Sequence, residues 1–134
     1  MPGIDACLLD AMTLSGAQGA ALVDWTSGLA LGTVGEPPRG DHETTAAEAA
    51  ELVRLTVEQS VFAPQSSPGG ADPAGGGGVE DLLITSATHY HLLRVVESAL
   101  EAGVFLHIWL GRAEGNLALA RIRLRELTER LVLE

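Results

Sequence analysis

Histidines are the residues of this chain with the clearest potential for chemistry. His89 and His91 lie two residues apart in an apolar run, so on a β-strand their imidazoles would share a face and could donate two ligands to a metal. No third ligand stands at a matching spacing, and zinc sites need three or four, which favours surface histidines at a strand end. His107, between Phe105 and Trp109, is typical of a hydrogen-bonded core or interface histidine rather than a catalyst. The sequence therefore predicts neither a metal nor a cofactor.

Activated nucleophiles are not apparent either. There is no Gly-x-Ser-x-Gly motif, and no pairing of Cys with His and no carboxylate dyad stands out. Four consecutive glycines at 75–78 lack the Lys and the Ser or Thr of a phosphate-binding loop, and the chain contains no Lys. Cys7 has no His or Arg near it in sequence, which favours a half-buried structural thiol. We expect a protein without a catalytic site of its own.

Composition narrows the class of protein. With 134 residues, of which 46% are apolar, residues 1–134 suit a single domain with a sizeable core. The net charge of -10 argues against a nucleic-acid partner, because phosphate binding needs clustered positive charge. No run is long and apolar enough for a membrane helix, and no secretory signal is recognisable at the N-terminus. A single cysteine makes a reducing cytoplasm the expected location.

The second half of the chain predicts a three-stranded antiparallel meander closed by a helix. Apolar runs occupy 79–87, 89–97 and 103–111, separated by turn residues. In the last run the alternate residues on both faces are apolar, which indicates a sheet covered on both sides. The helix, from about 113 to 132, has one apolar stripe: Leu117, Ala120, Leu124, Leu127 and Leu131. On its other face we expect ion pairs between Glu126 and Arg130 and between Arg125 and Glu129.

The first half predicts a short helix, a hairpin and a long helix. The short helix covers 4–14, and strands at 20–24 and 29–34 flank a turn whose chemistry comes from Asp24 and Gly28. Asp41 is a plausible N-cap for a helix reaching Phe62. The stripe of that helix is rich in small residues that permit close approach to a sheet or to another copy of the helix: Ala46, Ala50, Val53, Val57 and Val61. Residues 64–78, with 6 Gly and 3 Pro, are expected to form a mobile loop.

Several segments now resemble one family. Residues 19–24 (GAALVD) with 28–31 (GLAL), residues 79–85 (VEDLLIT) and above all 115–124 (GNLALARIRL) are similar to the roadblock/dynein light chain family. The similarity covers nearly the whole chain apart from the glycine-rich loop, and its most specific part is the NLALAR segment that opens the last helix.

The resemblance implies a fold and a mode of assembly. The fold is α+β, a profilin-like roadblock sandwich in which a five-stranded antiparallel sheet carries the long helix on one face and the two terminal helices on the other. Family members typically form homodimers in which the strand matching 80–87 pairs with its twin and the long helices pack across the dyad. The dimer-interface residues implied here are Leu82, Leu83, Ile84, Ala46, Ala50, Val53 and Val57.

The resemblance also implies a partner. Bacterial relatives commonly act on Ras-like small GTPases through the surface around the long helices, which here would use Glu48, Glu51, Arg54, Glu58 and Gln59. Arg54 is the only base on the long helix and so the natural candidate for an arginine finger, but flanking Glu51 and Glu58 favour a local ion-pair ladder. We expect a cytoplasmic homodimeric regulator or scaffold of a Ras-like GTPase that acts by protein contact and is not itself an enzyme. A structural adaptor in a signalling complex and a small-ligand sensor remain the alternatives.

Overall fold

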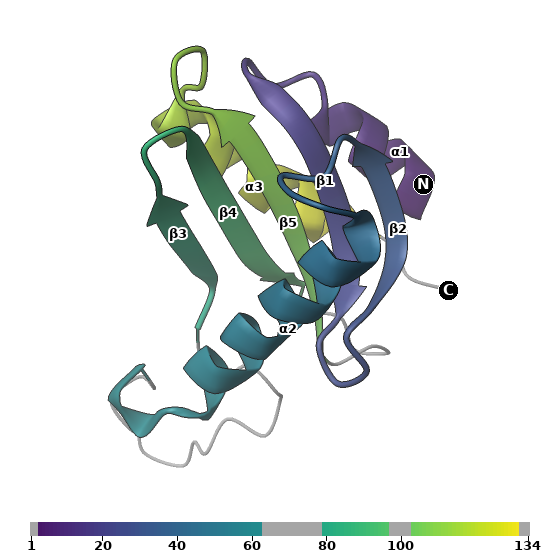
Figure 1. Ribbon diagram of the computed structural model, residues 1–134, viewed down its shortest axis with the longest axis vertical. Helices are drawn as coiled ribbons and strands as arrows, with labels where there is room; N and C mark the ends of the chain where they lie inside the picture. The colour runs from purple at the N-terminus through teal and green to yellow at the C-terminus, as the bar shows by residue number, and fades with distance from the viewer. Residues whose placement is uncertain (1–2, 63–78, 97–102, 132–134) are drawn as a thin grey trace.

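The chain folds into a five-stranded sheet with helices on both faces (Figure 1). The computed structural model describes residues 3–62, 79–96 and 103–131, so the predicted loop at 64–78 lies outside the described residues. The elements in chain order are α1 (Ile4–Ala11), β1 (Ala17–Asp24), β2 (Leu29–Gly35), α2 (His42–Glu58), the 3-10 helix η1 (Ser60–Phe62), β3 (Asp81–Thr85), β4 (His89–Val96), β5 (Val104–Gly111) and α3 (Leu117–Arg130).

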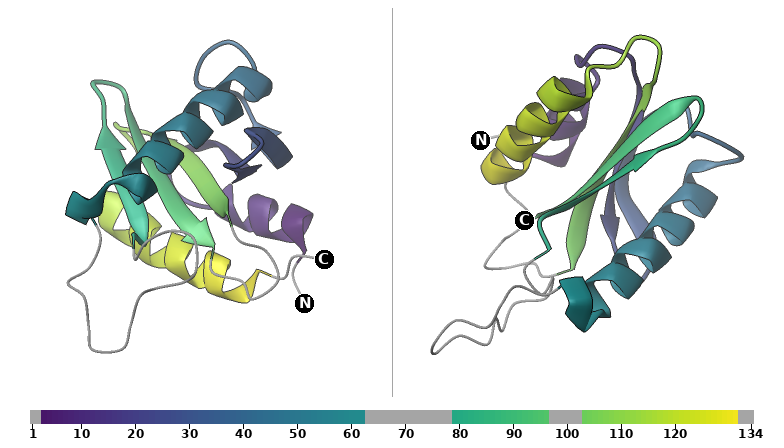
Figure 2. Two further views of the ribbon diagram at one scale, coloured as in Figure 1. Left: turned by 90° about the horizontal axis from the view of Figure 1, so that it is seen from below. Right: turned by 90° about the vertical axis from the view of Figure 1, so that its left-hand side faces the viewer.

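The sheet is antiparallel throughout and has the order β2-β1-β5-β4-β3. The central strand β5 is buried along its whole length, with Leu106 and Ile108 on one face and Phe105 and Trp109 on the other. Figure 2 shows α1 and α3 on one side of the sheet and α2 on the other. The predicted α+β sandwich is therefore confirmed, including the helix arrangement and the apolar character of both faces of the last strand.

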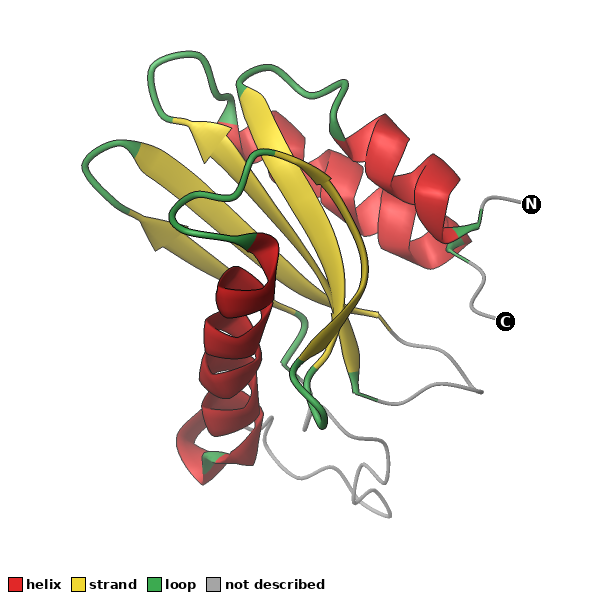
Figure 3. Ribbon diagram, turned by 45° about the vertical axis from the view of Figure 1, so that its right-hand side comes forward, coloured by secondary structure: helices red, strands yellow, loops and turns green. Residues whose placement is uncertain are grey.

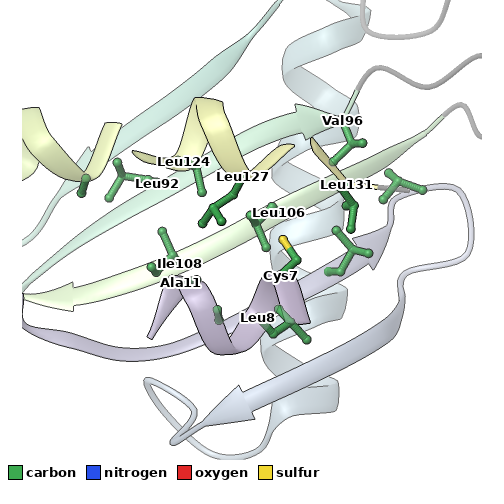
Figure 4. Close-up of a cluster of buried hydrophobic side chains, with 14 of the residues drawn as sticks. Cys7, Leu8, Ala11, Leu92, Val96, Leu106, Ile108, Leu124, Leu127 and Leu131 are labelled. Atoms are coloured by element: carbon green, nitrogen blue, oxygen red, sulfur yellow. The ribbon is translucent and has the colours of Figure 1, made fainter. Parts of the chain in front are cut away.

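One core lies between the sheet and the pair α1 and α3 (Figure 4). The predicted stripe of α3 packs there, since Leu124 and Leu127 are almost completely buried. α3 begins at Leu117 because the side chain of Asn116 accepts a hydrogen bond from the Leu119 amide at 3.0 Å. Cys7 is buried in the same core, and burial raises the pKa of its thiol to about 11, as befits a structural cysteine.

The ion pairs on the outer face of α3 differ in part from the prediction. Arg125 and Glu129 pair at 3.4 Å, as expected. Glu126 instead pairs with Arg123 at 3.2 Å. Arg130 is consequently available to Asp10, at 3.8 Å, and this contact joins α3 to α1. The predicted pair of Glu126 with Arg130 was wrong because a partner on another helix cannot be read from helical spacing.

The other core lies beneath α2. This helix begins where the Asp41 carboxylate accepts a hydrogen bond from the Thr44 amide at 2.7 Å, which confirms the predicted N-cap. Its buried residues all belong to the first part of the helix: Ala46, Ala49, Ala50 and Val53. The helix ends at Glu58 rather than near Phe62, because Gln59 adopts an extended backbone (φ -85°, ψ 127°). Val61 is 79% exposed, so the predicted continuation of the stripe to Val61 was wrong.

Glycine makes one close approach possible inside β1. The strand begins at Ala17, earlier than predicted, and runs through Gly19. A Cβ on Gly19 would lie 2.6 Å from Cε2 of Trp109 and 2.7 Å from the carbonyl oxygen of Glu36. The indole of Trp109 crosses β1 at this point and donates a hydrogen bond to that same carbonyl at 2.8 Å. Gly19 therefore leaves the space that the indole of Trp109 occupies.

Candidate protein-binding surface

β3 forms one edge of the sheet, on the side of the molecule where α2 crosses (Figures 1 and 3). Within the described residues its backbone pairs with β4 only. Leu82 packs partly into the core under α2, and Ile84, also on that face, is 38% exposed. Leu83 points to the opposite face and is 43% exposed. A strand edge with apolar side chains and open backbone groups is a surface that proteins usually cover.

The predicted interface residues of α2 divide into two groups. Three are at most 1% exposed and pack on the chain's own sheet: Ala46, Ala50 and Val53. The small-residue stripe therefore serves close approach to the sheet, which answers the question that the sequence left open. Val57 is partly buried against the same core. The large apolar residues of α2 that remain open to another molecule are Leu52, 37% exposed, and Leu55, 50% exposed.

A hollow of about 230 Å³ separates α2 from the β3 edge. Its lining includes Thr45, Glu48 and Leu52 from α2, Ile84 from β3, His91 from β4 and His107 from β5. The hollow exists because the backbone of α2 approaches β1 and β2 most closely, so the opposite part of this sheet face is less covered. It joins Leu52 of α2 to Ile84 of β3 in one surface.

Two histidines of the hollow form a hydrogen-bonded pair. His91 Nδ1 and His107 Nε2 are 3.0 Å apart, so one ring donates to the other. His107 is only 4% exposed, and its Nδ1 is buried without a hydrogen-bond partner among the described residues. Burial, followed by the neighbouring His91, lowers the pKa of His107 to about 3. Burial and then His89 also lower the pKa of His91 below 6.5. Both rings are therefore neutral at pH 7.

All four histidines of the chain and one tryptophan form a continuous row of rings across this face. Ring centroids are 6.0 Å apart from His42 to Trp109, 4.7 Å from Trp109 to His107, 5.3 Å from His107 to His91 and 5.9 Å from His91 to His89. His107 is the hydrogen-bonded core histidine that the sequence predicted. His91 is more buried than a surface histidine, because the register places it beside Trp109.

No metal site emerges from the histidine row. His89 Nε2 lies 2.8 Å from the side-chain oxygen of Gln18, and His89 Nδ1 lies 2.7 Å from the hydroxyl of Thr88, so both ring nitrogens have protein partners. Among residues 3–62, 79–96 and 103–131, no group of three or more His, Cys, Asp or Glu is arranged to hold a metal ion.

The predicted partner-binding residues lie on the outer face and at the end of α2. Glu48, Glu51, Glu58 and Gln59 are exposed. Arg54 is only partly exposed, because it pairs with Glu51 and its Nη1 donates a hydrogen bond to the carbonyl oxygen of Trp25 at 2.6 Å. These contacts hold the guanidinium within its own chain. They support the ion-pair interpretation over the arginine finger, although Arg54 forms no ion pair with Glu58.

Asp81 anchors the start of β3, a role that no motif in the sequence signals. Its side chain is 10% exposed, and Oδ2 lies 3.4 Å from Arg94 Nη1 and 3.1 Å from Arg121 Nε. Arg94 also donates to the Thr128 hydroxyl at 3.3 Å. The cluster fastens β3 to β4 and α3. Only the pairing of Asp81 opposite Arg94 in the β3–β4 hairpin could have indicated it.

Comparison with solved structures identifies the fold. The chain superposes on a Roadblock/LC7 domain from Streptomyces avermitilis with a TM-score of 0.70 and 18% identity, covering 96% of this chain and 93% of that one. The chain has the roadblock fold. Myxococcus xanthus MglB gives a TM-score of 0.69 at 16% identity, with 94% and 91% covered. The gliding protein MglB from Thermus thermophilus gives 0.67 at 13% identity, with 92% and 81% covered.

The roadblock fold rests on structure rather than on sequence similarity. No protein-family model matches the chain, and no curated protein sequence is significantly similar to it. The resemblance of short segments, such as the one opening α3, is thus supported by a similarity of fold that extends over almost the whole chain. None of the helices among the described residues has the length and apolar character needed to cross a membrane.

Proposed function

We propose that this roadblock-fold chain is a homodimeric regulator or scaffold of a Ras-like small GTPase and acts through protein contact alone. The observation that carries the proposal is the β3 edge, where exposed Ile84 lines the same hollow as Leu52 of α2 and exposed Leu83 points to the other face of the sheet. A second copy that pairs its β3 with this edge would continue the sheet and cover those side chains.

The outer face of α2 supports a protein partner with positive potential. Glu48, Glu51 and Glu58 are all exposed there, on a chain whose net charge is -10. Such a face attracts a basic surface and raises the rate of encounter at low ionic strength. That the partner is a Ras-like GTPase is inferred from the family resemblance and from the likeness to MglB structures. In this proposal the chain changes the conformation of its GTPase, and Arg54 remains in its own ion pair.

The small-ligand sensor receives less support from the geometry. Three hollows lined by described residues measure about 170 to 250 Å³, and the loop at 64–78 beneath which such a sensor would hold its ligand lies outside the described residues. Pockets for drug-sized ligands typically measure about 300 to 1,000 Å³ and enclose most of the ligand. An adaptor without effect on nucleotide turnover would use the same surface, so experiment must separate it from a regulator.

The proposed dimer is tested by the mass of the protein in solution. Light scattering of the wild type should give about 28 kDa, twice the 13.9 kDa of one chain. Leu83→Lys should give a monomer, because a charge at the strand edge would be buried without a partner. Leu119→Lys is the matched control, since Leu119 is 52% exposed on α3 and is not part of the sheet edge. A wild-type monomer, or a dimer unaffected by Leu83→Lys, contradicts this interface.

The proposed partner is tested by adding a Ras-like GTPase from the same organism in its GTP-bound and GDP-bound forms. A complex that forms only with the GTP-bound form, together with a changed rate of GTP hydrolysis, is the expected result for a regulator. Binding without a change in that rate would support the adaptor. Absence of binding to either form would contradict the proposed partner.

A further inference from the structure

We propose that the His91–His107 pair makes self-association of this chain sensitive to acid, so that two copies associate across β3 and α2 while both rings are neutral and separate when His91 takes up a proton. The inference rests on the homodimer proposed above and adds a means of regulating it. Its starting point is that His91 lines the same hollow as Ile84 of the β3 edge.

The position of His91 makes its charge state matter for association. Its ring is partly buried in the single chain, beside the side chains that a second copy would cover. Covering this surface removes the remaining water, and an imidazolium ion without water or a carboxylate partner is strongly disfavoured. The neutral ring carries no such cost. Association should therefore favour the neutral form, and a proton on His91 should oppose association.

The hydrogen bond to His107 adds a cost to the charged form of His91 that does not depend on a second copy. While both rings are neutral, the proton between His91 Nδ1 and His107 Nε2 can belong to either ring. Once His91 is protonated on both nitrogens, it must donate to His107 Nε2. His107 then carries its own proton on Nδ1, which is buried and has no acceptor among the described residues. The charged pair thus has a single arrangement, and that arrangement leaves a buried N–H unsatisfied.

Each element packed around His91 contributes a group that affects whether its ring carries a charge. From α2, the carboxylate of Glu48 lines the same hollow and favours the charged ring, but it is exposed and water screens it. From β4, His89 disfavours a charge on His91, and from β5 the neutral ring of His107 shares a hydrogen bond with it. From β3, the neighbour is apolar Ile84. The groups that oppose the charge are therefore closer or more buried than the one that favours it.

The sign of the effect distinguishes it from the general influence of net charge. Two copies that each carry a charge of -10 repel one another, and acid reduces that repulsion. Net charge alone would therefore make the dimer tighter as the pH falls. Weakening on acidification requires a buried base at the interface.

The test measures the dimer dissociation constant by sedimentation equilibrium at pH 7.5, 6.5 and 5.5, with far-UV circular dichroism to show that the chain stays folded. For the wild type we expect the constant to rise by about tenfold or more over this range. Its limiting slope is about two decades per pH unit if each copy takes up one proton on separating. His91→Asn should give a flat profile, because the amide can occupy the position of Nδ1 and bond His107 but does not titrate. His89→Gln, next in the ring row, should retain an acid response that begins at a higher pH, because it removes a neighbour that disfavours the charge on His91.

Three outcomes overturn the inference. If the dissociation constant of the wild-type dimer stays the same or falls as the pH is lowered, the inference is contradicted and the proposed dimer is not. The same holds for a pH response that survives in His91→Asn. A chain that remains monomeric at pH 7.5 instead contradicts the proposed homodimer and the inference with it.

Discussion

Replacing Asp81, the only charged residue of β3, by Asn should loosen this edge of the sheet. Asp81 Oδ2 faces Arg94 at 3.4 Å, with side chains that are 10% and 13% exposed, and a hydrogen bond between charged groups in such surroundings contributes about 1.5–3 kcal/mol. The contact with Arg121 adds less than about 1 kcal/mol, because that arginine is 57% exposed. Together they predict that Asp81→Asn lowers the free energy of unfolding by about 2–3 kcal/mol.

Urea denaturation followed by circular dichroism measures this loss, at one fixed protein concentration because self-association would shift the midpoint. Arg121→Gln is one control and should cost less than about 1 kcal/mol. Glu80→Gln is the matched control, since Glu80 is the neighbouring acid, is 65% exposed and reaches Arg94 only at 4.0 Å. It should be nearly neutral. If Asp81→Asn costs no more than Glu80→Gln, the burial argument for this cluster is refuted.

Further predictions concern the two cores. Gly19→Ala should cost about 1–3 kcal/mol in urea denaturation through overlap with Trp109, and Gly3→Ala, where the added Cβ meets nothing within 4 Å, much less. Cys7, with its pKa raised from 9.0 to about 11, should react with iodoacetamide about a hundredfold more slowly at pH 8 in the native than in the unfolded chain; equal rates would contradict its burial. Because the pKa of His107 falls from 6.5 to about 3 on folding, its contribution to stability is complete above pH 6.5 and lost as the pH falls toward 3, at up to about 1.4 kcal/mol per pH unit. In His107→Leu the urea midpoint should fall less steeply between pH 6.5 and pH 3 than in the wild type. An equally steep fall would contradict the assigned role of His107.

Features encoded by neighbouring residues could be predicted from the sequence. The turn between β1 and β2 follows the expected chemistry: Gly28 has a φ of +77° and its amide donates to the Asp24 carbonyl at 2.8 Å. The N-cap Asp41 and the alternation along β5 were predictable for the same reason, since each depends on residues within a few positions. Fold class follows from such local signals together with the family resemblance.

Contacts between distant segments could not be predicted in this way. His91 and His107 are 16 residues apart, and Asp81 and Arg121 are 40 apart, so each pair depends on strand order and register. The prediction that α2 reaches Phe62 was wrong for a different reason. Residues up to Phe62 keep a helical apolar spacing, but past Val53 no residue of the helix is fully buried, so the spacing lacks the packing that would sustain a helix.

The uneven attachment of α2 has a consequence for how it would meet a partner. At its start, the Asp41 cap, the bond from His42 Nε2 to the Gly35 carbonyl at 2.9 Å and the buried alanines hold the helix to the sheet. Toward its end Leu55 is half exposed, and in Figure 1 the helix continues past β3 and β4 into η1. Amide hydrogen exchange should therefore be slowest around Val53 and faster from Leu55 onward. The final turn can lengthen, unwind or tilt while the core beneath the first turns stays unchanged. A partner that bound at this end would therefore contact residues other than those that stabilise the helix at its start.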